Sequence, residues 1–340
     1  MPTTAPSLAL PGAVPADPPD ELVAGHYGDP SGEQRAWDST PSVVDRSHLG
    51  VVVVDGPDRL TWLHALTSQA LDRLAPHTPT ELLVLSPQGH VEHHASAVDD
   101  GVRTWLVVEP AAAPSLVDFL DRMRFMSRVE VVDASDRYAV LTVRNLVDVP
   151  APDSGVLIAR RWPVGGGPTD LVVPRAALAV TWDRLVAGGA RPVDHLAYEA
   201  SRIDAGQARF GLDTDHRTLA HEAGWIGVAV HLDKGCYRGQ ETVARVHNLG
   251  RPPRRLVLVH IDGSGHVLPA RGSELLQDGR VVGRLTSVAM HAESGPIGLA
   301  LLRQAVRLGA QLTTADGIAV AVEADVSSPT EPVDLSGLRG

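Results

Sequence analysis

The sequence is poor in cysteine, because Cys236 is the only one among 340 residues. A single cysteine excludes a disulfide within the chain and is typical of a reducing compartment. Long apolar runs are also lacking, since no stretch reaches the roughly 18 residues that a membrane-spanning helix needs. The N-terminus lacks a basic region before an apolar run, so no secretory signal is expected. We therefore expect a cytoplasmic protein without a membrane segment.

Positive charge is scarce as well. The net charge is −11, which argues against a general nucleic-acid-binding surface over the whole chain. A local basic groove stays open, because Arg251, Arg254 and Arg255 lie close together in the sequence. Apolar residues make up 44% of the chain, which is enough for a full core. A length of 340 residues predicts two or three packed units.

The distribution of proline and glycine suggests where these units begin and end. Residues 1–41 carry eight prolines with little periodicity, which predicts a flexible arm. A second segment rich in proline and glycine lies near 150–168 and predicts an internal boundary or loop. We expect a main region over 42–250, a C-terminal domain over 251–326 and a flexible tail over 327–340.

Strands and helices alternate with hairpins in the main region. Strands are predicted at 51–54, 82–85, 105–108, 129–132, 138–143 and 171–173, with a further extended run ending at 98. Helices are predicted from Pro57, over 111–125, from Pro174 to Val186 and over 192–204. Short apolar runs at 255–261, 273–277, 280–288, 296–303 and 318–323 predict a small all-β unit, a barrel or sandwich. The pattern as a whole predicts the α+β class.

The most distinctive stretch is the octapeptide 234–241, which reads Lys-Gly-Cys-Tyr-Arg-Gly-Gln-Glu. If this segment is extended, Lys234, Cys236 and Arg238 point to the same face. Cations beside a thiol favour its reactive thiolate form. Gly235 and Gly239 would let the backbone turn sharply or approach another group closely. The alternative is a buried cysteine that acts as a small hydrophobic residue, with solvated cations around it.

A second candidate site lies at the end of the helix predicted over 192–204. Asp204 stands at the negative end of the helix dipole, where a carboxylate is tolerated if it has a partner. It could accept hydrogen bonds from a pair of ligand N–H groups. The alternative is a surface pair between Arg202 and Asp204, with Gly206 ending the helix.

The octapeptide resembles the signature of the YgfZ family, folate-binding relatives of the glycine cleavage system T protein. That signature reads Lys-Gly-Cys-(Tyr or Phe)-x-Gly-Gln-Glu, and all seven fixed positions match. Weaker similarity extends over roughly 45–325. The resemblance implies two α+β subdomains and a C-terminal β barrel arranged around a central pocket. It also implies binding of tetrahydrofolate or another reduced folate.

The resemblance carries roles to individual residues. Asp204 matches the acid that binds the pteridine ring in the T protein, although it is one methylene shorter and a water would have to bridge the gap. Cys236 and Lys234 become candidates for a redox or transfer step. The candidate folate-binding residues are Asp204, Arg202, Trp225, Tyr237, Gln240 and Glu241, and the remaining motif positions are Gly235, Arg238 and Gly239. For Trp225, ordinary core packing is the alternative.

One departure concerns the reaction. The T protein carries its catalytic acid after a turn that resembles the segment before Glu92, and Glu92 and His93 occupy the places of its acid pair. The catalytic aspartate is therefore not matched, which argues against aminomethyltransferase activity. His90, Glu92 and His94 would share a face of a strand and could bind zinc, but an exposed polar strand face is the better interpretation. We expect no metal site.

Three functional hypotheses remain. The first is an accessory factor of iron–sulfur enzyme assembly or repair, with Cys236 as a redox or transfer thiol. Its partners would include iron–sulfur proteins such as a tRNA methylthiotransferase, as the resemblance implies. The second is a folate-dependent one-carbon transferase, and the third is a folate-responsive binding module without chemistry at Cys236.

Overall fold

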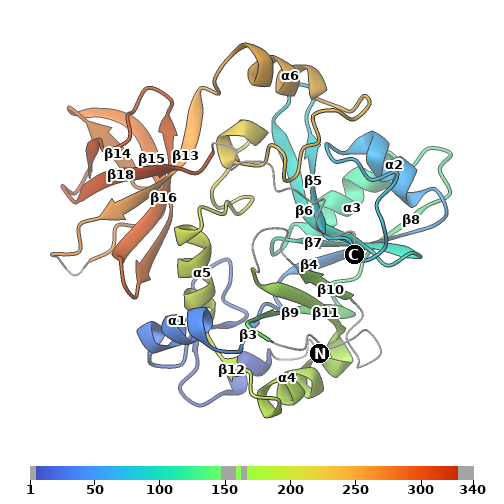
Figure 1. Cartoon of the computed structure of the whole chain (residues 1–340), viewed down its shortest axis with the longest axis horizontal. Helices are drawn as coiled ribbons and strands as arrows, with labels where there is room; N and C mark the ends of the chain where they lie inside the picture. Colours follow the sequence, from blue (N-terminus) through green and yellow to red (C-terminus); the bar gives the residue numbers. More distant parts are fainter. Residues whose placement is uncertain (1–4, 147–157, 162–166, 266, 328–340) are drawn as a thin grey trace.

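The structure is a computed structural model that describes residues 5–146, 158–161, 167–265 and 267–327. Three modules, two of them sheets covered by helices and one a closed barrel, are arranged as a ring (Figure 1). The α+β class and the C-terminal barrel expected from the sequence are confirmed. No helix among the described residues is long and apolar enough to cross a bilayer.

The first sheet has the strand order β5-β6-β7-β4-β8 and is antiparallel throughout. Its strands are β4 (Gly50–Asp55), β5 (Thr80–Leu85), β6 (Val91–Asp99), β7 (Arg103–Val108) and β8 (Glu130–Asp133). Helices α2 (Arg59–Leu66) and α3 (Ala113–Arg122) cover one face, where Leu63 and Leu116 are buried against Val52 and Val54. Val51 and Val53 of β4 point to the opposite face and belong to a second core. Alternate residues of β4 therefore line two different cores.

The second sheet has the order β10-β11-β9-β3-β12. Its strands are β3 (Ser42–Asp45), β9 (Tyr138–Arg144), β10 (Ile158–Arg161), β11 (Thr169–Pro174) and β12 (Arg191–Pro192). Helix α4 (Leu178–Ala187) covers its outer face through Leu178 and Trp182. On the opposite face Val140 and Val172 pack against Val51 and Trp105 of the first sheet. The two sheets therefore share one apolar layer.

Helix α5 (His195–Asp204) connects the sheets to the barrel. Its N-cap is Asp194, whose side chain accepts a hydrogen bond from the Ala197 backbone N–H at 2.6 Å. Ala200 and Ile203 pack against barrel residues such as Leu299. The N-terminal part of α5 packs instead on helix α1 (Pro30–Ser39). Its two halves are therefore buried against different modules.

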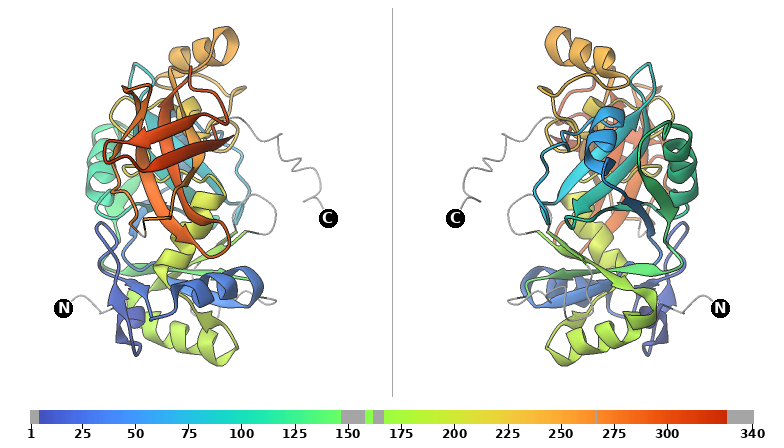
Figure 2. Two further views of the ribbon diagram at one scale, coloured as in Figure 1. Left: turned by 90° about the vertical axis from the view of Figure 1, so that its left-hand side faces the viewer. Right: turned by 90° about the vertical axis from the view of Figure 1, so that its right-hand side faces the viewer.

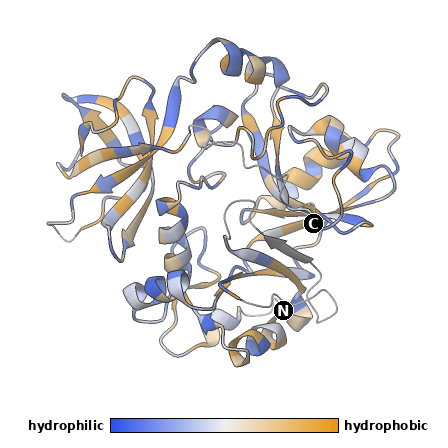
Figure 3. Ribbon diagram, in the orientation of Figure 1, coloured by the Kyte–Doolittle hydropathy of each residue, from blue (hydrophilic) through white to orange (hydrophobic). Residues whose placement is uncertain are grey.

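The C-terminal module is a closed six-stranded barrel with the order β13-β16-β15-β14-β17-β18. Its strands are β13 (Arg254–Ile261), β14 (Glu274–Gln277), β15 (Arg280–His291), β16 (Gly295–Arg303), β17 (Gln311–Thr314) and β18 (Ala319–Asp325). Apolar residues alternate along these strands (Figure 3), and the inward ones form a core that includes Val257, Leu285 and Val320. The left view of Figure 2 looks onto the barrel, with α4 at the opposite end of the molecule.

The prediction of a flexible arm over 1–41 is wrong for the described residues 5–41. They form a short 3-10 helix, a two-stranded ribbon of β1 (Val14–Pro15) and β2 (Ala24–His26), and α1. Trp37 is 1% exposed and packs edge-on against Tyr198. Asp20 is held by Arg209. Tyr198 and Arg209 lie far from these residues in the chain, so composition alone could not reveal the anchoring.

Other predictions differ from the structure at particular elements. The helix expected over 192–204 begins at His195, because Pro192 pairs in β12 instead. Helix α6 (Gln240–Leu249) and strand β17 were not predicted. The expected boundary between 250 and 251 falls between the end of α6 and the start of β13. Most of the loop expected near 150–168, and the tail expected over 327–340 apart from Ser327, lie outside the described residues.

Candidate functional site

The octapeptide is a turn that leads into α6, not an extended segment. Lys234 and Tyr237 are buried, whereas the thiol-bearing Cys236 between them is exposed. The buried alternative for the cysteine is therefore wrong, and so is the expectation that Lys234 and Cys236 share a face. Tyr237 packs into the apolar cluster of Leu85 and Val91. The two buried side chains fix the loop and leave its thiol at the surface.

Lys234 is the only lysine of the chain, and its ammonium group is committed to the backbone. Its Nζ donates to the carbonyl oxygens of Thr67 at 2.6 Å and Gln69 at 3.0 Å, and to that of His64. These carbonyls lie in and just beyond the last turn of α2, where helix carbonyls lack intrahelical partners and a cation is favoured. Lys234 therefore ties the cysteine loop to the first sheet module and does not act on the thiol.

Arg238 is the second cation of the motif, and it also has a partner. Its Nη1 donates to Glu92 Oε2 of β6 at 2.8 Å, and its guanidinium lies 5.7 Å from the Phe119 ring centroid. His93 contacts the same ring at 5.8 Å, and burial lowers its pKa to about 4. Glu92 is therefore an ion-pair partner, and His93 is a neutral imidazole, at the positions where the T protein has its acid pair.

Gly239 is required by the local backbone geometry. Its φ is +81°, and a Cβ there would lie 2.6 Å from the Ser86 carbonyl oxygen. It precedes the first residue of α6 and brings the loop against the turn at Gly89. Gly235 has no such restriction, since a Cβ there would meet nothing within 4 Å.

The predicted residues at the end of α5 lie in different environments. Arg202 is buried, and all three of its guanidinium nitrogens donate to protein acceptors. They include both carboxylate oxygens of Glu199 and one of Asp213. Asp204 is exposed, and no hydrogen bond or ion pair joins its side chain to another described residue. The alternative of an Arg202–Asp204 pair is therefore wrong.

A second arginine, Arg209, was missed by the sequence analysis. Its guanidinium donates to both oxygens of Asp20 at 2.8 Å, to Glu109 at 2.6 Å and to Glu199 at 3.0 Å. Because these residues come from separate parts of the chain, their ion pairs hold the N-terminal segment, the end of β7 and α5 together. Little in the sequence indicated that Arg209 forms ion pairs. It lies in the loop after the Asp204 motif, and no charged residue stands at positions 205–208.

The α5 network lines a small cavity of about 50 Å³ between the two sheets, α5 and the loop that follows α5. Its walls include Arg46, His94, Glu109, Tyr198, Arg202 and Arg209. Carboxylates and guanidiniums suit the polar edge of a pteridine, and Tyr198 offers an aromatic wall. The volume of the cavity does not suit a pteridine, because that ring needs a pocket several times larger. A folate therefore does not fit this cavity in the present structure.

Trp225 lies behind His94 of β6, which is part of the cavity wall. The Trp225 ring is buried and stacks on His94, with centroids 4.8 Å apart and planes 10° apart. His94 also contacts Glu81 at 2.9 Å. Trp225 is thus a core residue one layer from the cavity. The polar strand face expected at His90, Glu92 and His94 is not exposed throughout, because His94 is turned inward.

Two other predicted residues, Tyr237 and Gln240, line a separate cavity of about 420 Å³ between the cysteine loop and α6. Val243 and His247 complete its wall on the helix side. Glu241 is exposed on the first turn of α6. The structure therefore divides the predicted folate-binding residues between the cavity beside α5, the surface and this second cavity.

Comparison with known proteins relates this geometry to two groups. Residues 254–330 match the family model of the CAF17 C-terminal β-barrel domain. An iron–sulfur cluster assembly factor IBA57 homologue of Mycosarcoma maydis is 30% identical over 250 residues, which cover 68% of this chain and 60% of that protein. A putative chloroplastic transferase of Arabidopsis thaliana is 28% identical over 309 residues, or 83% of this chain and 70% of that protein.

The chain belongs to the CAF17/IBA57 family, of YgfZ type. The glycine cleavage aminomethyltransferase T of Bartonella henselae superposes with a TM-score of 0.80 and 17% identity, covering 98% of both chains. The whole fold is therefore that of the T protein. In this CAF17/IBA57 chain, two polar features are the candidates for function. They are the anchored cysteine loop and the Arg202–Arg209 network.

Proposed function

We propose that this chain is an accessory protein of iron–sulfur cluster assembly that presents the thiol of Cys236 to a partner. The observation that carries the proposal is the exposed thiol on a loop fixed by Lys234 on one side and Tyr237 on the other. Similarity to an iron–sulfur cluster assembly factor supports the same role. A fixed loop presents its thiol in one orientation, which favours transfer or ligation over non-specific reaction.

The proposal includes a partner because of ligand number. A [2Fe–2S] or [4Fe–4S] cluster is held by about four cysteine ligands. This chain has one cysteine, so the other ligands would come from an iron–sulfur protein bound at the loop. The resemblance to YgfZ proteins makes a tRNA methylthiotransferase one candidate client.

The decisive experiment is anaerobic transfer of a cluster from a donor protein to an apo client, followed by circular dichroism in the visible range. We expect the wild-type chain to raise the transfer rate and Cys236→Ser to abolish the increase. Ser294→Ala is the matched control, since it changes an exposed hydroxyl of the barrel and leaves the loop intact. Equal rates with Cys236→Ser and wild type would remove the thiol from the function.

A reduced folate is the proposed ligand. The T-protein fold supports this, while the cavity beside α5 would have to widen before a pteridine could enter. The cavity beside Gln240 is large enough already. Calorimetric titration with tetrahydrofolate should show binding to the wild type. Loss of about 1.5–3 kcal/mol in Asp204→Ala would place the ring near α5, and the same loss in Gln240→Ala would place it near α6. No heat with the wild type would refute the ligand.

Aminomethyl transfer is the alternative that the fold brings to mind, and the residues at the positions of its acid pair argue against it. Glu92 is paired with Arg238, and His93 stands where the second acid is found. We therefore expect no methylenetetrahydrofolate from an aminomethylated carrier protein. Formation of that product by the purified chain would establish the transferase instead.

A further inference from the structure

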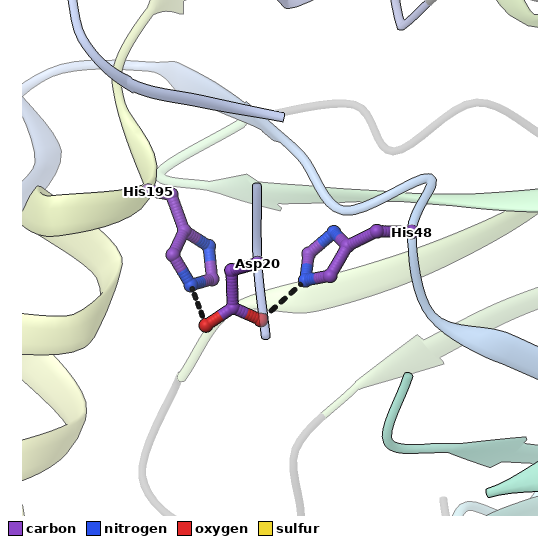
Figure 4. Close-up of side chains that lie close together, drawn as sticks. All are labelled: Asp20, His48 and His195. Atoms are coloured by element: carbon purple, nitrogen blue, oxygen red, sulfur yellow. Dashed lines mark hydrogen bonds and ion pairs between the residues drawn. The ribbon is translucent and has the colours of Figure 1, made fainter. Parts of the chain in front are cut away.

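Asp20, His48 and His195 meet in the interior from three separate parts of the chain (Figure 4). Asp20 precedes β2, His48 lies between β3 and β4, and His195 is the first residue of α5. His48 Nε2 is 2.9 Å from Asp20 Oδ1, and His195 Nε2 is 3.1 Å from Asp20 Oδ2. The three ligand-type atoms all lie within 4.8 Å of one another. The arrangement has the atoms and spacing of a metal site.

The imidazoles at this point are buried and incompletely bonded. Both rings are at most 2% exposed. Among the described residues, His48 Nδ1 and both nitrogens of His195 have no hydrogen-bond partner. His195 Nε2 is aimed at Asp20 but lacks the geometry of a hydrogen bond. Buried polar atoms without partners are rare in folded proteins, and a bound ion accounts for some of those that occur.

The net negative charge around the three residues also favours a bound cation. Arg202 and Arg209 are surrounded by four carboxylates, those of Asp20, Glu109, Glu199 and Asp213. Four negative and two positive groups leave a formal charge of −2 in a largely buried cluster. Uncompensated buried charge is costly, so this excess has to be balanced.

We propose that Asp20, His48 and His195 bind one divalent transition-metal ion of the zinc class. Two imidazole nitrogens and one carboxylate oxygen are ligands that Zn²⁺ and Co²⁺ favour, and they leave a fourth position open. A charge of +2 brings the buried cluster to neutrality. Arg209 holds both oxygens of Asp20, as outer partners commonly orient a ligating carboxylate.

The competing explanation is a metal-free cluster in which the Asp20 carboxylate alone partners the two imidazoles. The charged and titratable groups that face them are Asp20, Arg209, Glu199 and Arg46. His48 also belongs to the wall of a cleft of about 1150 Å³, with its ring buried behind that wall.

The test is a titration of chelator-treated protein with Co²⁺, followed by its visible ligand-field absorption. Cys236→Ser is the background, because it removes the only thiol that could bind the ion. We expect one Co²⁺ per chain, displaced by Zn²⁺. His48→Gln and His195→Gln should each weaken binding at least about 10–100-fold. His216→Gln, on an exposed loop, is the matched control and should bind as the background does.

Binding that is absent in the background, or unchanged by both site variants, would overturn the proposal. Near-UV circular dichroism shows whether each variant is folded. If a variant is not folded, the ligand shell of zinc in the Cys236→Ser background is measured by X-ray absorption instead. The proposed site requires two imidazoles in that shell, together with oxygen ligands. A zinc shell without two imidazoles would assign the metal to the surface.

Discussion

The ammonium group of Lys234 donates to the Thr67 carbonyl oxygen at 2.6 Å, so the cysteine loop is fixed to the end of α2. The cation nearest to the thiol in sequence therefore has a structural role. It supplies donors to carbonyls that the helix itself leaves without partners. The orientation of Cys236 depends on this anchor, and the stability of the anchor can be measured separately from any chemistry.

Lys234→Met should lower the free energy of unfolding by about 1–3 kcal/mol, because buried carbonyl oxygens lose their donor. Urea denaturation followed by tryptophan fluorescence measures the change. Arg217→Met is the control, since that exposed side chain lies on a surface loop. A stability loss no larger than in the control would mean that solvent replaces the ammonium without cost.

Gly239→Ala should be destabilising by at least about 1–3 kcal/mol, because the residue has a positive φ and its Cβ would meet the Ser86 carbonyl. Gly211→Ala is the matched control, since its φ is +83° and a Cβ there meets nothing within 4 Å. The difference between the two variants isolates the steric contact. Thermal unfolding that is the same in both would show that the loop can move away from Ser86.

The Arg238–Glu92 ion pair should contribute little to stability, since both side chains are more than one third exposed. A double-mutant cycle with Arg238→Gln and Glu92→Gln is expected to give a coupling energy of about 0.2–1 kcal/mol. The coupling should decrease in high salt. A coupling energy well above this range would indicate that the pair holds the loop in place as strongly as Lys234 does.

Stability should fall in acid because of the buried network. Arg202 and Arg209 hold the pKa of Glu199 below its ordinary value against the effect of burial. The contribution of this carboxylate is therefore present above its unfolded pKa of about 4.3 and is lost as the pH falls through the folded value. The stability gap between wild type and Glu199→Gln should narrow from pH 7 to pH 3 in urea titrations. A gap that stays constant would show that Glu199 is not ionised in the folded chain.

The repeating local patterns of this chain could be read from sequence. Short runs of apolar residues predicted the strands around Val52 and Val84, and helical spacing predicted α2 and α3. The pair Asp278-Gly279 is typical of a tight hairpin turn, and it joins β14 to β15. Helix α6 was missed because its first residues belong to the octapeptide, whose glycines and cations suggested a loop. The N-terminal arm was missed because its anchors are distant in sequence.

By itself the sequence determined the α+β class, the C-terminal all-β unit and the cysteine motif, since these follow from periodicity and from a short contiguous signature. Only the tertiary structure decided how the charged side chains are used. It directed Lys234 to carbonyls of α2, enclosed Arg202 and Arg209 among carboxylates, and left Asp204 in solvent. It also brought Asp20, His48 and His195 together. Ion pairs and ligand clusters depend on distances between residues far apart in the chain, and such distances exist only after the modules have packed.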